Sequence, residues 1–140
     1  MAFIPMIQSG GGTDVPDYSV FDDYANFDSP TLSSSVDHIS GGYKVKGNLV
    51  YVFMTIYLKP SAFGTSTNAT NVELISDLPE CATWGPVPFG RWNVVTVMGG
   101  TLLKYSAGQG ARIQVGLIPN EVKNLSDPRL ITKFIYNKKH

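Results

Sequence analysis

Cysteine and histidine, which carry much of the metal and nucleophilic chemistry of proteins, are nearly absent from this chain of 140 residues. It contains one cysteine, Cys81, and two histidines, His38 and His140. This set is too small for a tetrahedral zinc site or an internal disulfide, and it offers no evident Ser-His or Cys-His catalytic pair. We therefore expect no metal, no cofactor and no catalytic residues. We interpret Cys81 as a small buried apolar side chain in a protein folded in a reducing compartment.

Long apolar runs and a leader pattern are also missing. The longest apolar run, Leu49 to Leu58, is shorter than the roughly 18 residues needed to cross a bilayer, and it contains Thr55 and two tyrosines. The N-terminal sequence MAFIPMIQSGGG has no basic region, and Pro5 interrupts its short apolar patch. Such a segment is a poor signal peptide. We expect no membrane insertion.

Positive charge is absent from the first 43 positions. The six acidic residues there give this segment a formal charge of −6, and the rest of the chain, with 11 basic and five acidic residues, carries +6. Opposite charges favour association of the two parts, either within one chain or between neighbours. The basic residues are spread from Lys44 to Lys139 and form no cluster, so we expect no nucleic-acid binding.

Residues 1–40 are rich in Gly, Ser, Asp and Pro, and the triplet Gly10-Gly11-Gly12 predicts a flexible joint. We interpret residues 1–40 as an acidic, irregular N-terminal arm and residues 41–140 as the body. Aromatic residues recur every three positions in the arm, namely Tyr18, Phe21, Tyr24 and Phe27. An α-helix would spread them over half its circumference, so that element fits them imperfectly. These rings either anchor the arm on a neighbouring surface or cover the arm's own domain.

The body consists of apolar and alternating runs separated by Gly and Pro, which is the pattern of a compact antiparallel β domain. The length suits one domain with a single core. No helix of useful length is predicted in the body. A strand should end at Leu78-Pro79, and a hairpin is predicted at Gly99-Gly100. The predicted strands are residues 43–46, 49–59, 72–75, 92–98, 101–105, 111–118 and 130–136.

Both faces of the predicted strand 49–59 carry apolar bulk. One face is aliphatic, and the other carries Leu49, Tyr51, Phe53, Thr55 and Tyr57. A strand half exposed to water should alternate apolar with polar residues, so this strand is covered on both sides by its own fold or by a partner. We assign the aliphatic face to the core. We predict that Tyr51, Phe53 and Tyr57 form a homo-oligomer interface.

Surface aromatic residues are the remaining candidates for recognition. Trp84, Arg91, Trp92 and Tyr105 fall in or beside irregular segments. Aromatic faces bind sugar rings and other ligands at low conformational-entropy cost, and arginine adds polar contacts. We predict that these four residues bind a ligand. The alternative is that Trp84 and Trp92 fill the core beneath the Pro-rich segment 84–90.

The pieces of the body follow one another in a definite order. A hydrophobic strand, NLVYVFMTIYL, is followed by a variable loop, a strand that runs into Leu78-Pro79, and the segment VVTVMGGTLLKYSAGQGARIQVGLI. This order, over residues 43–119, resembles the C-terminal domains of phage tail-fibre and receptor-binding proteins. The resemblance implies an all-β fold, an antiparallel β-sandwich that is jelly-roll-like, carrying the irregular N-terminal arm.

The resemblance also implies a function. It indicates a bacteriophage virion structural protein of the tail or fibre type, not an enzyme, made in the bacterial host cytoplasm and assembled as a homotrimer. Host attachment would use a cell-surface saccharide as the usual ligand, and the arm, with Tyr18, Phe21, Tyr24 and Phe27, would dock onto other virion proteins. A capsid decoration or head-fibre protein with the same fold is the alternative. A small carbohydrate-active enzyme is a weaker alternative. Such an enzyme would need two carboxylates about 5 to 10 Å apart, and the sequence offers no convincing pair.

Overall fold

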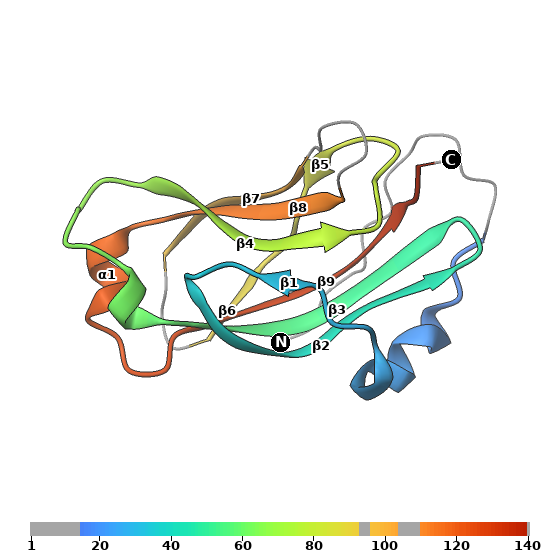
Figure 1. Cartoon of the computed structure of the whole chain (residues 1–140), viewed down its shortest axis with the longest axis horizontal. Coiled ribbons are helices and arrows are strands. Elements are labelled where there is room, and N and C mark those ends of the chain that lie inside the picture. The colour runs from blue at the N-terminus through green and yellow to red at the C-terminus, as the bar shows by residue number, and fades with distance from the viewer. Residues whose placement is uncertain (1–14, 93–95, 104–109, 140) are drawn as a thin grey trace.

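The computed structural model describes residues 15–92, 96–103 and 110–139, without the side chains of residues 91, 92, 102 and 103. These residues form two antiparallel sheets that pack face to face, one above the other in Figure 1. The helical elements are the 3₁₀-helices η1 (Tyr18–Asn26) and η2 (Pro60–Ala62) and the short α-helix α1 (Pro119–Lys123). The strands are β1 (Thr31–Leu32), β2 (Val36–Lys46), β3 (Leu49–Leu58), β4 (Thr70–Leu78), β5 (Gly85–Pro86), β6 (Gly90–Trp92), β7 (Val97–Leu103), β8 (Ala111–Leu117) and β9 (Arg129–Asn137).

The described strands are shared between a five-stranded sheet, in the order β1-β4-β8-β7-β5, and a four-stranded sheet, in the order β2-β3-β9-β6. The chain crosses from one sheet to the other after β1, β3, β5, β6 and β8, whereas β2–β3 and β7–β8 are neighbours within one sheet. All pairings are antiparallel. The prediction of an all-β antiparallel sandwich is therefore confirmed.

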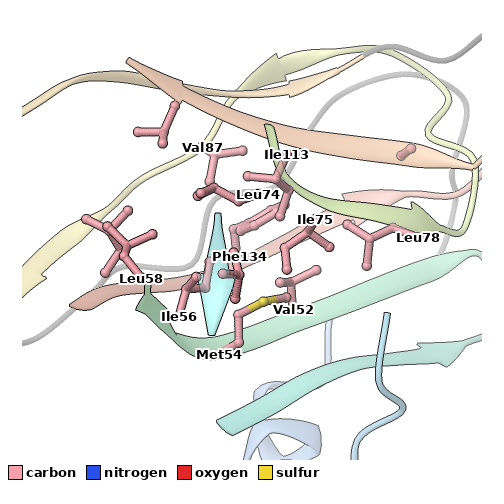
Figure 2. Packing of buried hydrophobic residues seen from close by; sticks show 14 of the residues in the cluster. Val52, Met54, Ile56, Leu58, Leu74, Ile75, Leu78, Val87, Ile113 and Phe134 are labelled. Atoms are coloured by element: carbon pink, nitrogen blue, oxygen red, sulfur yellow. The ribbon is translucent and has the colours of Figure 1, made fainter. Parts of the chain in front are cut away.

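The aliphatic face of β3 forms one wall of the core. Val52, Met54 and Ile56 point from β3 toward the five-stranded sheet, where Leu74 and Ile113 belong to the same buried cluster (Figure 2). Burying a side chain of this size contributes about 1.5–3 kcal/mol. The assignment of this face to the core is confirmed.

Strand positions agree with prediction where the apolar runs are uninterrupted. Strands β3, β8 and β9 match the predicted strands 49–59, 111–118 and 130–136 to within one residue at each end. The predicted strand 92–98 is wrong, because Trp92 belongs to the four-stranded sheet and Val97 to the five-stranded sheet.

The hairpin predicted at Gly99-Gly100 is also wrong, because both glycines lie inside β7. A Cβ on Gly100 would lie 2.3 Å from the Phe89 ring and 2.7 Å from the carbonyl oxygen of Val87. Gly100 therefore allows a close approach between neighbouring segments and does not form a turn.

The predicted boundary between an arm at residues 1–40 and a body at residues 41–140 is wrong. Strand β2 runs from Val36 to Lys46 through that point, and Val36 is buried in the main core. A Cβ on Gly42 would lie 2.0 Å from the carbonyl oxygen of Asp28, so the glycine admits that segment. Asp28 and Tyr43 exchange backbone hydrogen bonds of 2.8 and 3.0 Å. Residues before 41 are thus part of the sandwich.

The Leu78-Pro79 pair ends a strand, as predicted. Strand β4 ends at Leu78, whose side chain is 1% exposed. The carbonyl oxygen of Pro79 accepts a 2.7 Å hydrogen bond from the buried Tyr136 hydroxyl. Asp77, at a φ of 60°, accepts a 2.6 Å hydrogen bond from the Thr31 hydroxyl. These contacts attach the corner to β1 and β9.

Candidate recognition surface

The outer face of the four-stranded sheet, opposite the core, is divided into two halves. Alternate residues of β3, from Leu49 to Tyr57, point to this face, and cross-strand partners on β2 and β9 point the same way. One half lies beneath η1 and is here called the covered half. The other half, around Tyr57, is here called the open half.

Phe21 of η1 closes the covered half. Its side chain is 4% exposed and forms a small buried cluster with Leu49, Tyr51 and Ile135. The Phe21 ring meets the Tyr51 ring edge-on, with centroids 5.5 Å apart, and the Phe53 ring, with centroids 6.0 Å apart. Edge-to-face pairs of this kind add about 0.5–1.5 kcal/mol beyond their buried area. The first helix is therefore fixed to the sandwich by its own aromatic contacts.

The arm aromatics lie in and directly after η1, which is interrupted by a kink at Asp23 with a φ of −103° and a ψ of 27°. The rings do not share one side of this element, because Phe21 is buried whereas Tyr18 is 52% exposed. The sequence interpretation considered an α-helix and an irregular arm, and so missed the 3₁₀ segment. The three-residue spacing of the aromatics agrees with three residues per 3₁₀ turn but does not predict which ring is buried.

Asp17 fastens the start of η1. Its carboxylate accepts hydrogen bonds from the Ser19 hydroxyl at 2.6 Å and the Ser19 backbone N–H at 3.1 Å, and it pairs with Lys46 at 3.0 Å. Its backbone N–H donates to the Tyr51 hydroxyl at 2.9 Å. The hydrogen bond from the Ser19 side chain, followed by that from Lys46, lowers the pKa of Asp17 to about 2. The carboxylate is therefore favoured in the folded chain.

Two hollows border η1 in the described part of the chain, so the helix is held at points and not along its whole length. The larger, of 390 Å³, lies among Val15, Asp17, Lys46, Gly47, Leu49 and Tyr51. The smaller, of 230 Å³, lies among Ser19, Val20, Asp23, Phe27, Lys44, Val45 and Lys46. Phe21 and the Asp17 contacts hold η1 between these hollows, together with the contact between the Tyr24 and Phe53 rings.

These contacts correct two predictions. Tyr51 is 1% exposed within its own subunit, so its assignment to an oligomer interface is wrong. Phe53, assigned to the same interface, lies beneath Phe21 and Tyr24 of its own chain. Phe21, predicted to dock onto another virion protein, is buried on its own sheet, while Tyr18 and Tyr24 remain 52% and 43% exposed. The homotrimer itself stays a prediction. Tyr51 and Phe53 no longer support it, because both side chains are covered by their own subunit.

Three planar side chains stack across the open half. The His38 ring on β2 is parallel to the Tyr57 ring on β3, with centroids 4.0 Å apart and planes 11° apart. The Arg129 guanidinium on β9 lies 4.8 Å from the centroid of the Tyr57 ring. The strand register explains this arrangement, because Tyr57 pairs with both His38 and Arg129. We call these three residues the stacked row.

A carboxylate orients each end of the stacked row. Asp37 contacts His38 Nδ1 at 2.7 Å, and Asp127 accepts a hydrogen bond from Arg129 Nε at 3.2 Å. Hydrogen bonding to Asp127 raises the pKa of Arg129 above its ordinary value. Within the described residues, no hydroxyl is hydrogen-bonded to the His38 imidazole. The stacked row thus presents ring edges and hydrogen-bonding groups together on one sheet face.

The residues predicted to bind a ligand are only partly described. Trp84 is 67% exposed beside β5, so the alternative that it fills the core is wrong. The backbones of Arg91 and Trp92 pair with Leu130 and Arg129, which places Trp92 next to the stacked row in register. Their side chains, and Tyr105 altogether, lie outside the described residues.

The structure also bears on the environment of Cys81 and on groups that could hold a metal ion. Cys81 is buried, and its burial raises the pKa of its thiol, so its assignment as a small buried side chain is confirmed. In the described part of the chain, no group of three or more His, Cys, Asp or Glu side chains could hold a metal ion, and no helix is long and apolar enough to cross a membrane.

Fold and surface together define a β-sandwich whose four-stranded sheet carries the stacked row on its outer face. Comparison with known proteins adds no family to this description, because no family model, no curated protein and no solved structure matches the chain.

Proposed function

We propose that this chain is a structural, non-enzymatic protein of a bacteriophage particle, of the tail or fibre type, that attaches to the host by binding a surface saccharide. The observation that carries the proposal is the stacked row of His38, Tyr57 and Arg129 on the open half. Ring edges, an imidazole, a guanidinium and two carboxylates gather there on one sheet face. A saccharide presents many hydroxyls, and the imidazole, the guanidinium and the carboxylates can form hydrogen bonds with them.

The orientation of the stacked row favours binding. Asp37 and Asp127 hold the His38 and Arg129 side chains in place before a ligand arrives. Preorganised groups lose less conformational entropy on binding than freely rotating ones. The carboxylate oxygens can also accept hydrogen bonds from ligand hydroxyls, as charge-assisted bonds.

The outward side of η1 supports a second part of the proposal, which is docking onto another virion protein. Tyr18 is exposed there, and so are the carboxylates of Asp22 and Asp23. The Tyr24 ring contacts Phe53 but is still 43% exposed. Exposed aromatic rings among negative charges suit a partner surface with basic residues around an apolar patch. The docking role thus passes from four aromatic residues to two, because Phe21 and Phe27 lie on the sheet side of η1.

Immunogold electron microscopy of intact virions that encode this sequence tests the proposed function. An antibody raised against the full chain should label the tail or its fibres. Labelling of the head would instead favour the decoration or head-fibre alternative and contradict the tail assignment. Intact particles without any label, from a lysate that contains the chain, would overturn the virion role.

A further inference from the structure

The outer edge of β2 carries unpaired backbone groups. The β2–β3 hairpin closes with Lys46 opposite Leu49, so every second residue of β2 turns its N–H and C=O toward β3 and the residues between turn theirs outward. Tyr43 is one of the outward residues, and its backbone N–H and C=O form hydrogen bonds with the backbone of Asp28. Ile39 has the same orientation, whereas Gly41, with a φ of 83°, leaves the regular strand conformation. No partner for the backbone groups of either residue exists among the described residues. This segment is an open edge.

Two features limit the open edge. On one side, Asp28 occupies the position opposite Tyr43, so no further strand can pair there. On the other side, the register of β2 shifts between Val36 and His38, which marks a bulge at the start of the strand. The available edge is therefore residues 38–41, a length close to that of a short natural strand.

This edge is self-complementary. An antiparallel copy centred on Ile39 would place Ile39 opposite the partner's Ile39, and His38 opposite the partner's Ser40. Ile39 is half-buried at the rim of the main core, so its pairing extends apolar contact. His38 and Ser40 are exposed on the outer face and bring no like charges together. Any register that moves the partner strand toward Tyr43 would meet Asp28.

We propose that a second copy of this chain pairs its β2 edge with this one across a two-fold axis at Ile39, and that the two four-stranded sheets become one continuous sheet. Such a contact is isologous, since each subunit contributes the same residues. It would also bring two stacked rows onto one face, and two linked sites bind a repetitive ligand more tightly than one. That consequence rests on the proposed function, whereas the pairing itself does not.

Sedimentation equilibrium of the full chain tests the pairing. A contact of about four residues per strand is small, so we expect a monomer–dimer equilibrium with a dissociation constant in the micromolar range. A monomer at all concentrations up to about 500 µM, well above that range, would overturn the proposal. A trimer would overturn it as well, because a two-fold contact does not generate three subunits. Neither outcome would bear on whether the chain binds a saccharide.

A matched pair of double variants tests the register. In the variant His38→Lys with Ser40→Lys, each lysine at position 38 would face the lysine at position 40 of the second copy, which gives two repulsive pairs across the axis. The dissociation constant of the dimer should rise about tenfold. His38→Lys with Ser40→Glu sets opposite charges there and should restore the dimer. Both variants lose the His38 ring equally, and both sites are exposed, so folding is checked by circular dichroism. Equal dissociation constants for the two variants would refute the register.

A disulfide gives an independent test that does not depend on charge. Residues opposite each other in a hydrogen-bonded antiparallel pair have Cα atoms about 5.5 Å apart, which a disulfide can span. Ile39→Cys should therefore form a covalent dimer under mild oxidation. Thr55→Cys, on the interior strand β3, is the matched control and should remain monomeric. Failure of Ile39→Cys to cross-link in a folded protein, or equal cross-linking by the control, would contradict the pairing.

Discussion

Phe21 is a single ring that shields part of a sheet face from water. It contacts Tyr51 and Phe53 of β3, and the Lys133 ammonium lies 4.9 Å from its centroid. The ring shares a buried cluster with Tyr51, Leu49 and Ile135. At the residue scale, Phe21 is the buried side chain that η1 contributes to the covered half.

Replacing Phe21 by alanine should lower the free energy of unfolding by about 3 kcal/mol, because a buried aromatic ring is removed. Urea denaturation measures the change. Tyr18→Ala, on the same helix but half exposed, is the matched control and should change the free energy by less than about 0.5 kcal/mol. Equal effects of the two substitutions would mean that η1 does not depend on Phe21.

Leu78 at the end of β4 should behave as a core residue. Leu78→Ala should lower the free energy of unfolding by roughly 2 to 5 kcal/mol, because the side chain is almost fully buried. Met98→Ala removes an exposed side chain of similar size and serves as the control in the same urea titration. A change below about 0.5 kcal/mol at Leu78 would place the residue at the surface.

Asp17 should make the attachment of η1 sensitive to acid. Its pKa falls from 3.8 to about 2 on folding, so its stabilising contribution is present above pH 3.8 and is lost as the pH falls through about 2. Wild type should therefore have a higher Tm than Asp17→Asn at pH 5, and the difference should shrink steadily as the pH falls from about 4 through about 2. Melting curves of both proteins over this range provide the measurement. A difference in Tm that does not change with pH would contradict a stabilising role for the Asp17 carboxylate.

Strand β2 and helix η1 determine, at the scale of elements, where the domain begins. β2 contributes Val36 to the core and pairs with β3 along its length, and the segment before it supplies β1 and the Asp28 contact. The glycine pair at residues 41 and 42 marks a change in composition but not a domain boundary. The sandwich therefore needs residues that the composition assigns to an arm.

A chain that starts at Gly41 should fail to fold cooperatively. It would lack Phe21, which covers the outer face of β3, together with β1, the first half of β2 and the core residue Val36. Its far-ultraviolet circular dichroism and urea transition, compared with those of the full chain, give the measurement. A truncated chain with a cooperative transition near that of the full chain would show that these residues are dispensable.

Elements were predictable where one physical signal dominated. The residues of β3, β8 and β9 are apolar or alternating over their whole length, and they form strands as expected. Gly100 misled prediction because the contact that requires a glycine comes from Phe89, and local turn rules do not include such contacts. The stacked row was not predictable, since His38, Tyr57 and Arg129 meet only through the register of three strands far apart in the sequence.

The described chain, taken as a whole, is a sandwich whose four-stranded sheet has an outer face in two parts. The covered half completes the fold through η1, and the open half presents the stacked row. Trp84 is exposed beside the five-stranded sheet and gives that side a recognition candidate of its own. At this scale, the central claim is that attachment uses the open half.

Binding of the full chain, fluorescently labelled, to an array of bacterial surface saccharides tests this claim most directly. Wild type should bind at least one saccharide, and Tyr57→Ala should lower its affinity about tenfold or more, because the stack loses its central ring. Met98→Ala, exposed on β7 of the other sheet, should bind as wild type does. Folded wild type that binds no saccharide, or Tyr57→Ala that binds as well as wild type, would contradict the account.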